Sequence, residues 1–170
     1  MCFRSPTRPA RRALLALAVV LVAAGCSADH TPEAGDPVFA GLDSAVVNEV
    51  LASPAAQQRV EGDDEGAAKA RYQGMVRNFI ACRSALSVYQ TWVATGEAPA
   101  FPDQPRPTNP SATAKQLDQD IQQLRDHASS GDISLLRDDL TTESGCGHWI
   151  PAKPADPSGP TIADVVNGRS

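Results

Sequence analysis

A long run of regularly spaced apolar residues in the middle of the chain dictates its architecture. The intervals alternate between three and four residues through Tyr72, Met75, Phe79, Cys82, Leu86, Tyr89 and Val93. This spacing is typical of one face of an α-helix, continued here over several turns. Asp64 is a suitable residue before the helix and Gly96 a suitable residue after it, so the pattern predicts a helix from about Asp64 to Thr95. We expect this helix to be the spine of the core.

Two shorter segments after it have the same character. The first carries Ala114, Leu117, Ile121, Leu124 and Ala128. Thr113 and Gln116 are placed to close its N-terminus as a capping box. Gly131 ends this helix, and Asp132 is expected to cap a short helix that follows. The apolar residues of that short helix are Ile133, Leu136 and Leu140.

Two start signals precede the long helix. Asp36-Pro37 and Ser53-Pro54 each combine an N-cap residue with a proline suited to the first helical position. The first signal predicts a helix whose apolar stripe contains Phe39, Leu42, Val46 and Val50. Residues 61–66, EGDDEG, form a polar break before the long helix. The acids there would stabilise the start of the long helix through its dipole. A calcium loop is the alternative, but the order of the residues does not fit one.

These patterns predict an all-α domain. No segment shows the alternating β-branched pattern of a strand. Prolines at every second or third position make residues 99–110 an extended loop. The expected fold is a small bundle of about four helices with Pro-rich loops and one disulfide.

The N-terminus has the layout of a secretory signal. Residues 1–12 carry four arginines and no acid, and residues 13–24 are twelve consecutive apolar residues. A membrane-spanning helix needs about 20, so the run fits the apolar region of a signal peptide. The sequence VAAGC at 22–26 resembles the lipobox of bacterial lipoproteins, with Ala23 where many lipoboxes carry leucine. Ordinary cleavage after Ala24 is the alternative.

The lipoprotein resemblance implies that Cys26 becomes an acylated mature N-terminus, which anchors the chain in membrane lipid on the extracytoplasmic side of the cell membrane. Residues 1–25 are then a cleaved signal, 26–36 a flexible tether, 37–150 the helical domain and 151–170 a Pro-rich tail with a short helix. A tether of this length reaches about 33 Å at full stretch, so a protein partner must be membrane-proximal. Abundant alanine and proline with scarce lysine are typical of high-GC genomes and favour an actinobacterial source.

Charge narrows the range of partners. Without the four signal arginines the chain has 11 basic and 20 acidic residues, a formal charge of −9. Nucleic-acid binding needs clustered cations to neutralise phosphates, so it is not expected. The same charge repels the domain from anionic lipid.

Cysteine usage predicts one disulfide. Cys2 leaves with the signal and Cys26 is acylated, so Cys82 and Cys146 remain in an oxidising compartment. Their bridge would close a loop of about 64 residues, worth about 4 kcal/mol on the chain-entropy model. The alternatives are a catalytic cysteine or a metal site formed by both cysteines with His148 and His127. Zinc sites usually show paired ligands at close spacing, which are missing here, so no metal or cofactor is expected.

Four side chains are candidates for ligand or partner contact: Tyr89, Trp92, His148 and Trp149. His148 is expected at the surface beside the bridge, and Trp149 is expected to cover the bridge or the end of the long helix. The favoured hypothesis is a non-enzymatic interaction or accessory module, since no catalytic motif occurs. The alternative is a small-ligand carrier with a pocket between helices near Tyr89, Trp92 and Trp149.

The tail has a regular proline pattern. Pro151, Pro154, Pro157 and Pro160 recur at every third residue. A polyproline II helix would align them along one edge as a docking strip. A stiff loop leading to a short helix at 161–167 is the favoured interpretation.

Overall fold

The computed structural model describes residues 32–58 and 64–169. Its helices are η1 (Pro37–Phe39, a 3-10 turn), α1 (Ser44–Leu51), α2 (Pro54–Gln57), α3 (Glu65–Thr95), α4 (Ala114–Ser129), α5 (Ile133–Thr141) and α6 (Ile162–Val166). The described ranges contain no strand, and α1, α3, α4 and α5 are each at least 8 residues long. The predicted all-α fold with about four substantial helices and one disulfide is confirmed.

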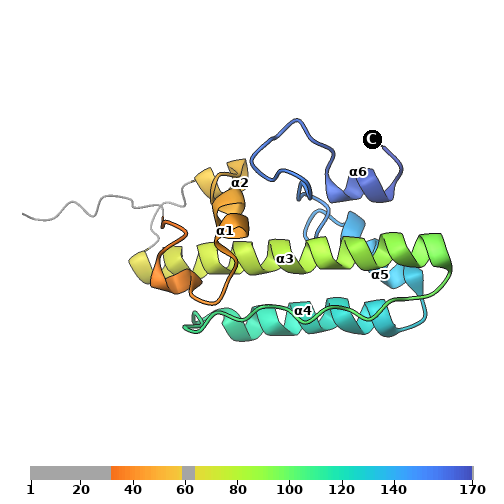
Figure 1. Ribbon diagram of the computed structural model, residues 1–170, viewed down its shortest axis with the longest axis horizontal. Coiled ribbons are helices and arrows are strands. Elements are labelled where there is room, and N and C mark those ends of the chain that lie inside the picture. Colours follow the sequence, from red (N-terminus) through yellow and green to blue (C-terminus); the bar gives the residue numbers. More distant parts are fainter. Residues whose placement is uncertain (1–31, 59–63, 170) are drawn as a thin grey trace, which may run out of the picture. The chain divides into compact units, whose positions relative to one another are not determined.

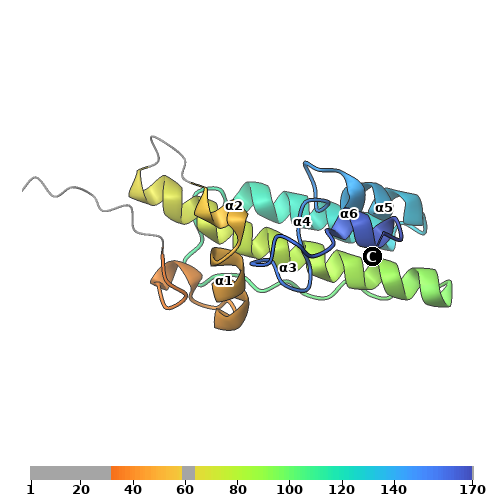
Figure 2. The ribbon, with the colours of Figure 1, turned by 90° about the horizontal axis from the view of Figure 1, so that it is seen from above.

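The spine of the core is α3, as predicted. The Asp64 carboxylate accepts a hydrogen bond from the Ala67 backbone N–H at 2.7 Å, which caps the first turn. Gly96 ends the helix with a φ of 79°, a left-handed conformation that favours glycine. Helix α3 contacts η1, α1, α4 and α5. Figures 1 and 2 show α1 and α2 beside its N-terminal half, α5 and α6 toward its C-terminal half, and α4 running alongside.

The predicted apolar stripe is buried over most of its length but not at its end. Tyr72, Phe79, Cys82 and Leu86 are buried, and Met75 and Tyr89 are partly buried. Val93 is 61% exposed, so its place in the core was wrongly predicted. The last turn of α3 extends past the other helices of the described chain (Figures 1 and 2).

A second face of α3 is also buried, although two of its members are polar. This face consists of Gln73, Arg77, Ala81, Ala85, Val88 and Trp92. The Gln73 amide donates to Val38 O at 2.6 Å and to Asn109 O at 3.0 Å, and it accepts from Ser111 N at 2.8 Å. These bonds satisfy backbone groups of two separate loops, which explains why a glutamine is retained in the interior.

The first start signal produces less helix than predicted. Asp36 caps only η1, because Ala40 then adopts an extended ψ of 126° and the chain turns. A separate helix, α1, begins at Ser44 with the Asp43 carboxylate accepting from Ala45 N and Val46 N. The stripe that starts at Phe39 is therefore not one continuous helix. The second signal is confirmed, since Ser53 caps α2 by accepting from Ala56 N.

The capping box expected at α4 does not form. Thr113 has a helical backbone conformation, and its hydroxyl pairs with that of Ser111 at 3.2 Å. Gln116 instead donates to Asp120 at 3.0 Å. The cap of the next helix is confirmed, because the Asp132 side chain caps α5 as predicted.

The chain's capping box lies at α6, within the predicted short helix of the tail. Thr161 accepts from Asp164 N, and the Asp164 carboxylate accepts from Thr161 N at 3.1 Å. The Thr161 hydroxyl also donates to that carboxylate at 2.7 Å. The hydroxyl bond, followed by the backbone bond, lowers the pKa of Asp164 below its usual value.

The two ends of the described chain show how far the packed domain extends. Pro32 is buried and Asp36 N donates to Glu33 O at 2.9 Å, so the packed domain begins before residue 37. The signal, Cys26, His30 and most of the tether lie outside the described residues. In the tail, backbone bonds from Asp156 N to Lys153 O and from Gly159 N to Asp156 O form successive turns. The prolines therefore lie in a turning loop, the favoured interpretation, rather than along one polyproline edge.

Candidate functional site

The site is organised around the disulfide between Cys82, in the middle of α3, and Cys146, in the loop after α5. Their Cα atoms are 5.3 Å apart and both residues are buried. A Cβ added to Gly145 would lie 2.6 Å from Asp139 O, and one added to Gly147 would lie 2.7 Å from Thr141 O. Glycine is therefore required where this loop crosses the end of α5. The predicted disulfide is confirmed, and the bonded sulfurs serve neither as a nucleophile nor as metal ligands.

His148 lies at the surface as expected, whereas Trp149 packs against the middle of α3 and not against its end. Trp149 is buried, and its ring lies edge-on to Phe79 of α3 with centroids 5.3 Å apart. His148 is exposed, with its ring 5.0 Å from that of Trp149. The His148 Nδ1 is 3.1 Å from Glu143 O, which orients the imidazole. Together these rings form a wall that stands above α3.

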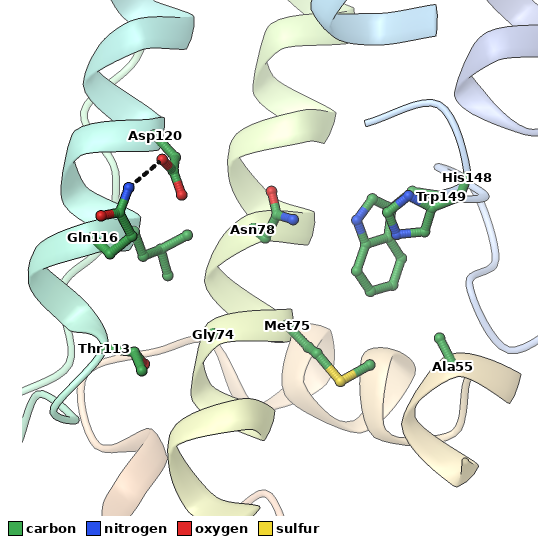
Figure 3. A pocket seen from close by; sticks show the side chains of 10 residues that line it. Ala55, Gly74, Met75, Asn78, Thr113, Gln116, Asp120, His148 and Trp149 are labelled. Atoms are coloured by element: carbon green, nitrogen blue, oxygen red, sulfur yellow. Dashed lines mark hydrogen bonds between the residues drawn. The ribbon is translucent and has the colours of Figure 1, made fainter. Parts of the chain in front are cut away.

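Beside this wall is a groove of about 400 Å³ (Figure 3). Helix α3 forms its floor, α4 one side, and the 148–149 wall with α2 the other. Its lining residues are Ala55, Gly74, Met75, Asn78, Thr113, Gln116, Leu117, Asp120, His148 and Trp149. The lining combines apolar surface with a few polar groups, the usual character of a binding site. We call this feature the α3–α4 groove.

Gly74 gives the groove an unusual floor. An added Cβ at Gly74 would meet no heavy atom of the structure within 4 Å outside its own helical turns. Glycine within a helix costs about 1 kcal/mol relative to alanine. The packing of the described chain does not require this glycine, yet its absent side chain leaves bare helix backbone at the bottom of the groove.

Polar groups lie at three places in the groove. Gln116 and Asp120 of α4 form a hydrogen-bonded pair on one side. The Asn78 oxygen is 3.4 Å from the Cys82 sulfur, and its amide nitrogen points toward Trp149 in Figure 3. The Trp149 indole nitrogen is buried without a hydrogen-bond acceptor in the described chain. The wall therefore contains a donor that the protein itself leaves unused.

The structure brings together only two of the four predicted contact residues. His148 and Trp149 line the groove, whereas Tyr89 and Trp92 do not. Because an α-helix rises about 1.5 Å per residue, Tyr89 lies about 16 Å along α3 from Asn78. Sequence reasoning missed Gly74, Met75 and Leu117 as neighbours of the wall. The one available signal was a glycine that interrupts an otherwise strong helical pattern.

No family model, curated protein or solved structure matches this chain. The groove must therefore be interpreted from its own chemistry. In the part of the chain that the structure describes, no helix is long and apolar enough to cross a membrane. The same residues contain no group of three or more His, Cys, Asp or Glu side chains placed to hold a metal. His127, the other histidine considered as a ligand, instead has Nδ1 2.6 Å from an Asp139 carboxylate oxygen.

Proposed function

We propose that this protein is a lipid-anchored extracytoplasmic interaction module, without catalytic activity of its own, that docks a polypeptide segment of a membrane-proximal partner in the α3–α4 groove. Gly74 is the observation that carries this proposal. Its bare backbone lies in open space where the chain's own packing requires no glycine. Glycine in such a place permits another backbone to approach closely.

A polypeptide segment suits both the apolar and the polar part of the groove lining. Met75, Leu117 and Trp149 offer apolar contact for a side chain, while Gly74 accommodates the main chain beside it. Gln116 and Asp120 add polar groups at one side, where partner amides would otherwise lose their hydrogen bonds to water. The lipobox resemblance supports the location, since acylation of Cys26 would hold the groove within a few tens of Å of the membrane.

The anchor itself is tested at Cys26. We expect the mature protein from membranes to begin at Cys26 and to carry acyl chains, as measured by intact mass. Cys26→Ala should eliminate the acylated species and release the protein from the membrane fraction. Cys2→Ala is the matched control, because that cysteine leaves with the signal and the mature mass should not change. A wild-type chain that starts at Gly25 without acyl chains would overturn the lipoprotein assignment.

The groove is tested by filling it. Gly74→Leu places a side chain in open space, so we expect loss of partner contact without loss of folding. A photo-crosslinking residue at Gln116, on the groove, should give a discrete crosslinked product in living cells, and the same residue at exposed Gln90 of α3 should not. Gly74→Leu should abolish the product. Ser87→Leu, at an exposed position on the same helix, should retain it.

Melting curves separate binding from stability in this experiment. Gly74→Ala should raise the free energy of unfolding by about 1 kcal/mol, because alanine is the better helix former and meets no neighbour there. Gly74→Leu should melt no lower than wild type. A crosslinked product that persists in a folded Gly74→Leu variant would exclude the groove as the docking site.

A small-ligand carrier is the second candidate, favoured by the groove volume of about 400 Å³. Small-molecule sites are typically about 300–1,000 Å³ and mostly apolar. In this case native mass spectrometry of the purified protein should show a bound small molecule that Gly74→Leu removes. The crosslinking experiment would then give no product at Gln116, which distinguishes the two functions.

A further inference from the structure

A second cavity, of about 270 Å³, lies between α3, a different face of α4 and the extended loop that joins them. We call it the arginine cavity, since three arginines line it: Arg77 of α3, Arg125 of α4 and Arg106 of the loop. Two carboxylates, Asp103 and Asp118, also line it, which leaves one excess positive charge. In a chain whose formal charge is −9 without the four arginines of residues 1–12, this concentration of guanidinium groups is a local reversal of sign.

Arg77 is the buried member of the set. It is 3% exposed and pairs with Asp118, whose other oxygen is 4.0 Å from Arg106 Nη2. Its Nε–H is buried without an acceptor in the described chain. A buried donor of a charged group that has no acceptor is costly, because the hydrogen bond it made to water is not replaced.

Two further groups in the cavity have the same deficit. Arg125 pairs with Asp103 at 3.3 Å, but its Nε–H is also buried without an acceptor. Gln104 donates through its amide nitrogen to Pro102 O at 3.0 Å, which fixes the amide orientation. The Gln104 side-chain oxygen is then buried without a donor. The residues that line the cavity thus include two with a buried, unused donor and one with a buried, unused acceptor.

We propose that the arginine cavity binds a phosphate group that retains a proton, as inorganic phosphate or as the protonated, singly charged form of a phosphate monoester. The phosphate oxygens accept from the unused Arg77 and Arg125 Nε–H groups, and guanidinium groups are well suited to this geometry. The phosphate hydroxyl donates to the Gln104 oxygen. This site is separate from the α3–α4 groove and does not depend on the docking function proposed above.

The unused acceptor selects among anions. Sulfate and a carboxylate carry no proton at neutral pH, so neither can donate to Gln104. A phosphodiester, as in most anionic lipid headgroups, also lacks the hydroxyl. The cavity is therefore expected to distinguish a protonated phosphate from the phosphodiester surface beside which the protein is anchored.

Isothermal titration calorimetry of the full purified chain tests this inference. Inorganic phosphate and glycerol 3-phosphate are the two probes for the free anion and the monoester, and at least one should bind. Sulfate and vesicles that contain phosphatidylglycerol should bind at least tenfold more weakly. Arg106→Ala, at a residue whose side chain is 76% exposed, should fold normally and weaken phosphate binding roughly tenfold. Arg83→Ala removes an α3 charge outside the cavity, on a side chain that is 51% exposed, and should leave binding unchanged.

Each outcome bears on the proposal directly. Absence of heat with both phosphate probes would overturn it, and equal binding of sulfate would show a general anion surface instead of a phosphate site. Gln104→Met removes the acceptor and should reduce the preference for phosphate over sulfate. Gly74→Leu should bind phosphate as wild type does, so failure of the groove proposal and failure of this one are distinguishable.

Discussion

Replacing Cys82 and Cys146 together with alanine is expected to lower the free energy of unfolding by about 4 kcal/mol. The bridge closes a loop with a sequence separation of 64, and a crosslink of that span strongly restricts the unfolded chain. For a domain of this size the loss corresponds to a fall in Tm of roughly 10–15 °C. Alanine is chosen because both positions are buried, and a serine hydroxyl there would add an unsatisfied polar group.

Chemical reduction provides the control for this double variant. Calorimetry of the wild-type protein with reductant should show a similar fall in Tm, because the same loop is opened without any change of side chain. The double variant should not respond to reductant. If the reduced wild-type protein melts at the same temperature as the oxidised one, the disulfide does not stabilise the fold as the structure implies.

Phe79→Ala is expected to cost about 3–5 kcal/mol, the usual range for a fully buried aromatic residue. Phe79 has no exposed surface and packs edge-on against Trp149. Its removal leaves a cavity beneath the wall of the α3–α4 groove. Urea unfolding, monitored by circular dichroism, measures the loss as a shift in the midpoint.

Val93→Ala is the matched comparison, because Phe79 and Val93 belong to the same apolar stripe in the sequence. The structure leaves Val93 61% exposed, so its truncation should change the free energy of unfolding by less than about 0.5 kcal/mol. Equal losses for the two variants would mean that the end of α3 is covered in solution. A small effect of Phe79→Ala would contradict the core described above.

The helices could be predicted where local signals and tertiary packing agree. The limits of α3 follow from two local effects. The Asp64 side chain caps the first turn, and Gly96 adopts the left-handed conformation that ends the last one. Val93 fits the stripe equally well, but its burial depends on how far neighbouring helices extend, and spacing along one helix contains no such information. Thr113 has the right residue type for a cap, yet the conformation of the preceding loop decides whether its hydroxyl is available.

Polar residues in the interior were the main feature that sequence patterns could not show. Gln73 and Arg77 lie on a buried face, but a hydrophobic pattern treats such residues as solvent-exposed. They are buried because segments distant in sequence, η1 and α4, place a carbonyl and a carboxylate group beside them. The arginine cavity was missed for the same reason, and the α3–α4 groove contains only Trp149 of the three residues expected around a pocket. The disulfide could be predicted from the cysteine count and the expected export alone.

The position of the disulfide also governs what proteolysis can do to the chain. Helices α4 and α5 and the extended loop before them all lie between the two bonded cysteines, so this part of the protein is a covalent ring. A protease that cuts the exposed residues of that loop opens the ring but does not divide the molecule. The two resulting termini remain joined through the sulfurs, and no fragment is shed. Only cuts before Cys82 or after Cys146 release a piece of the chain.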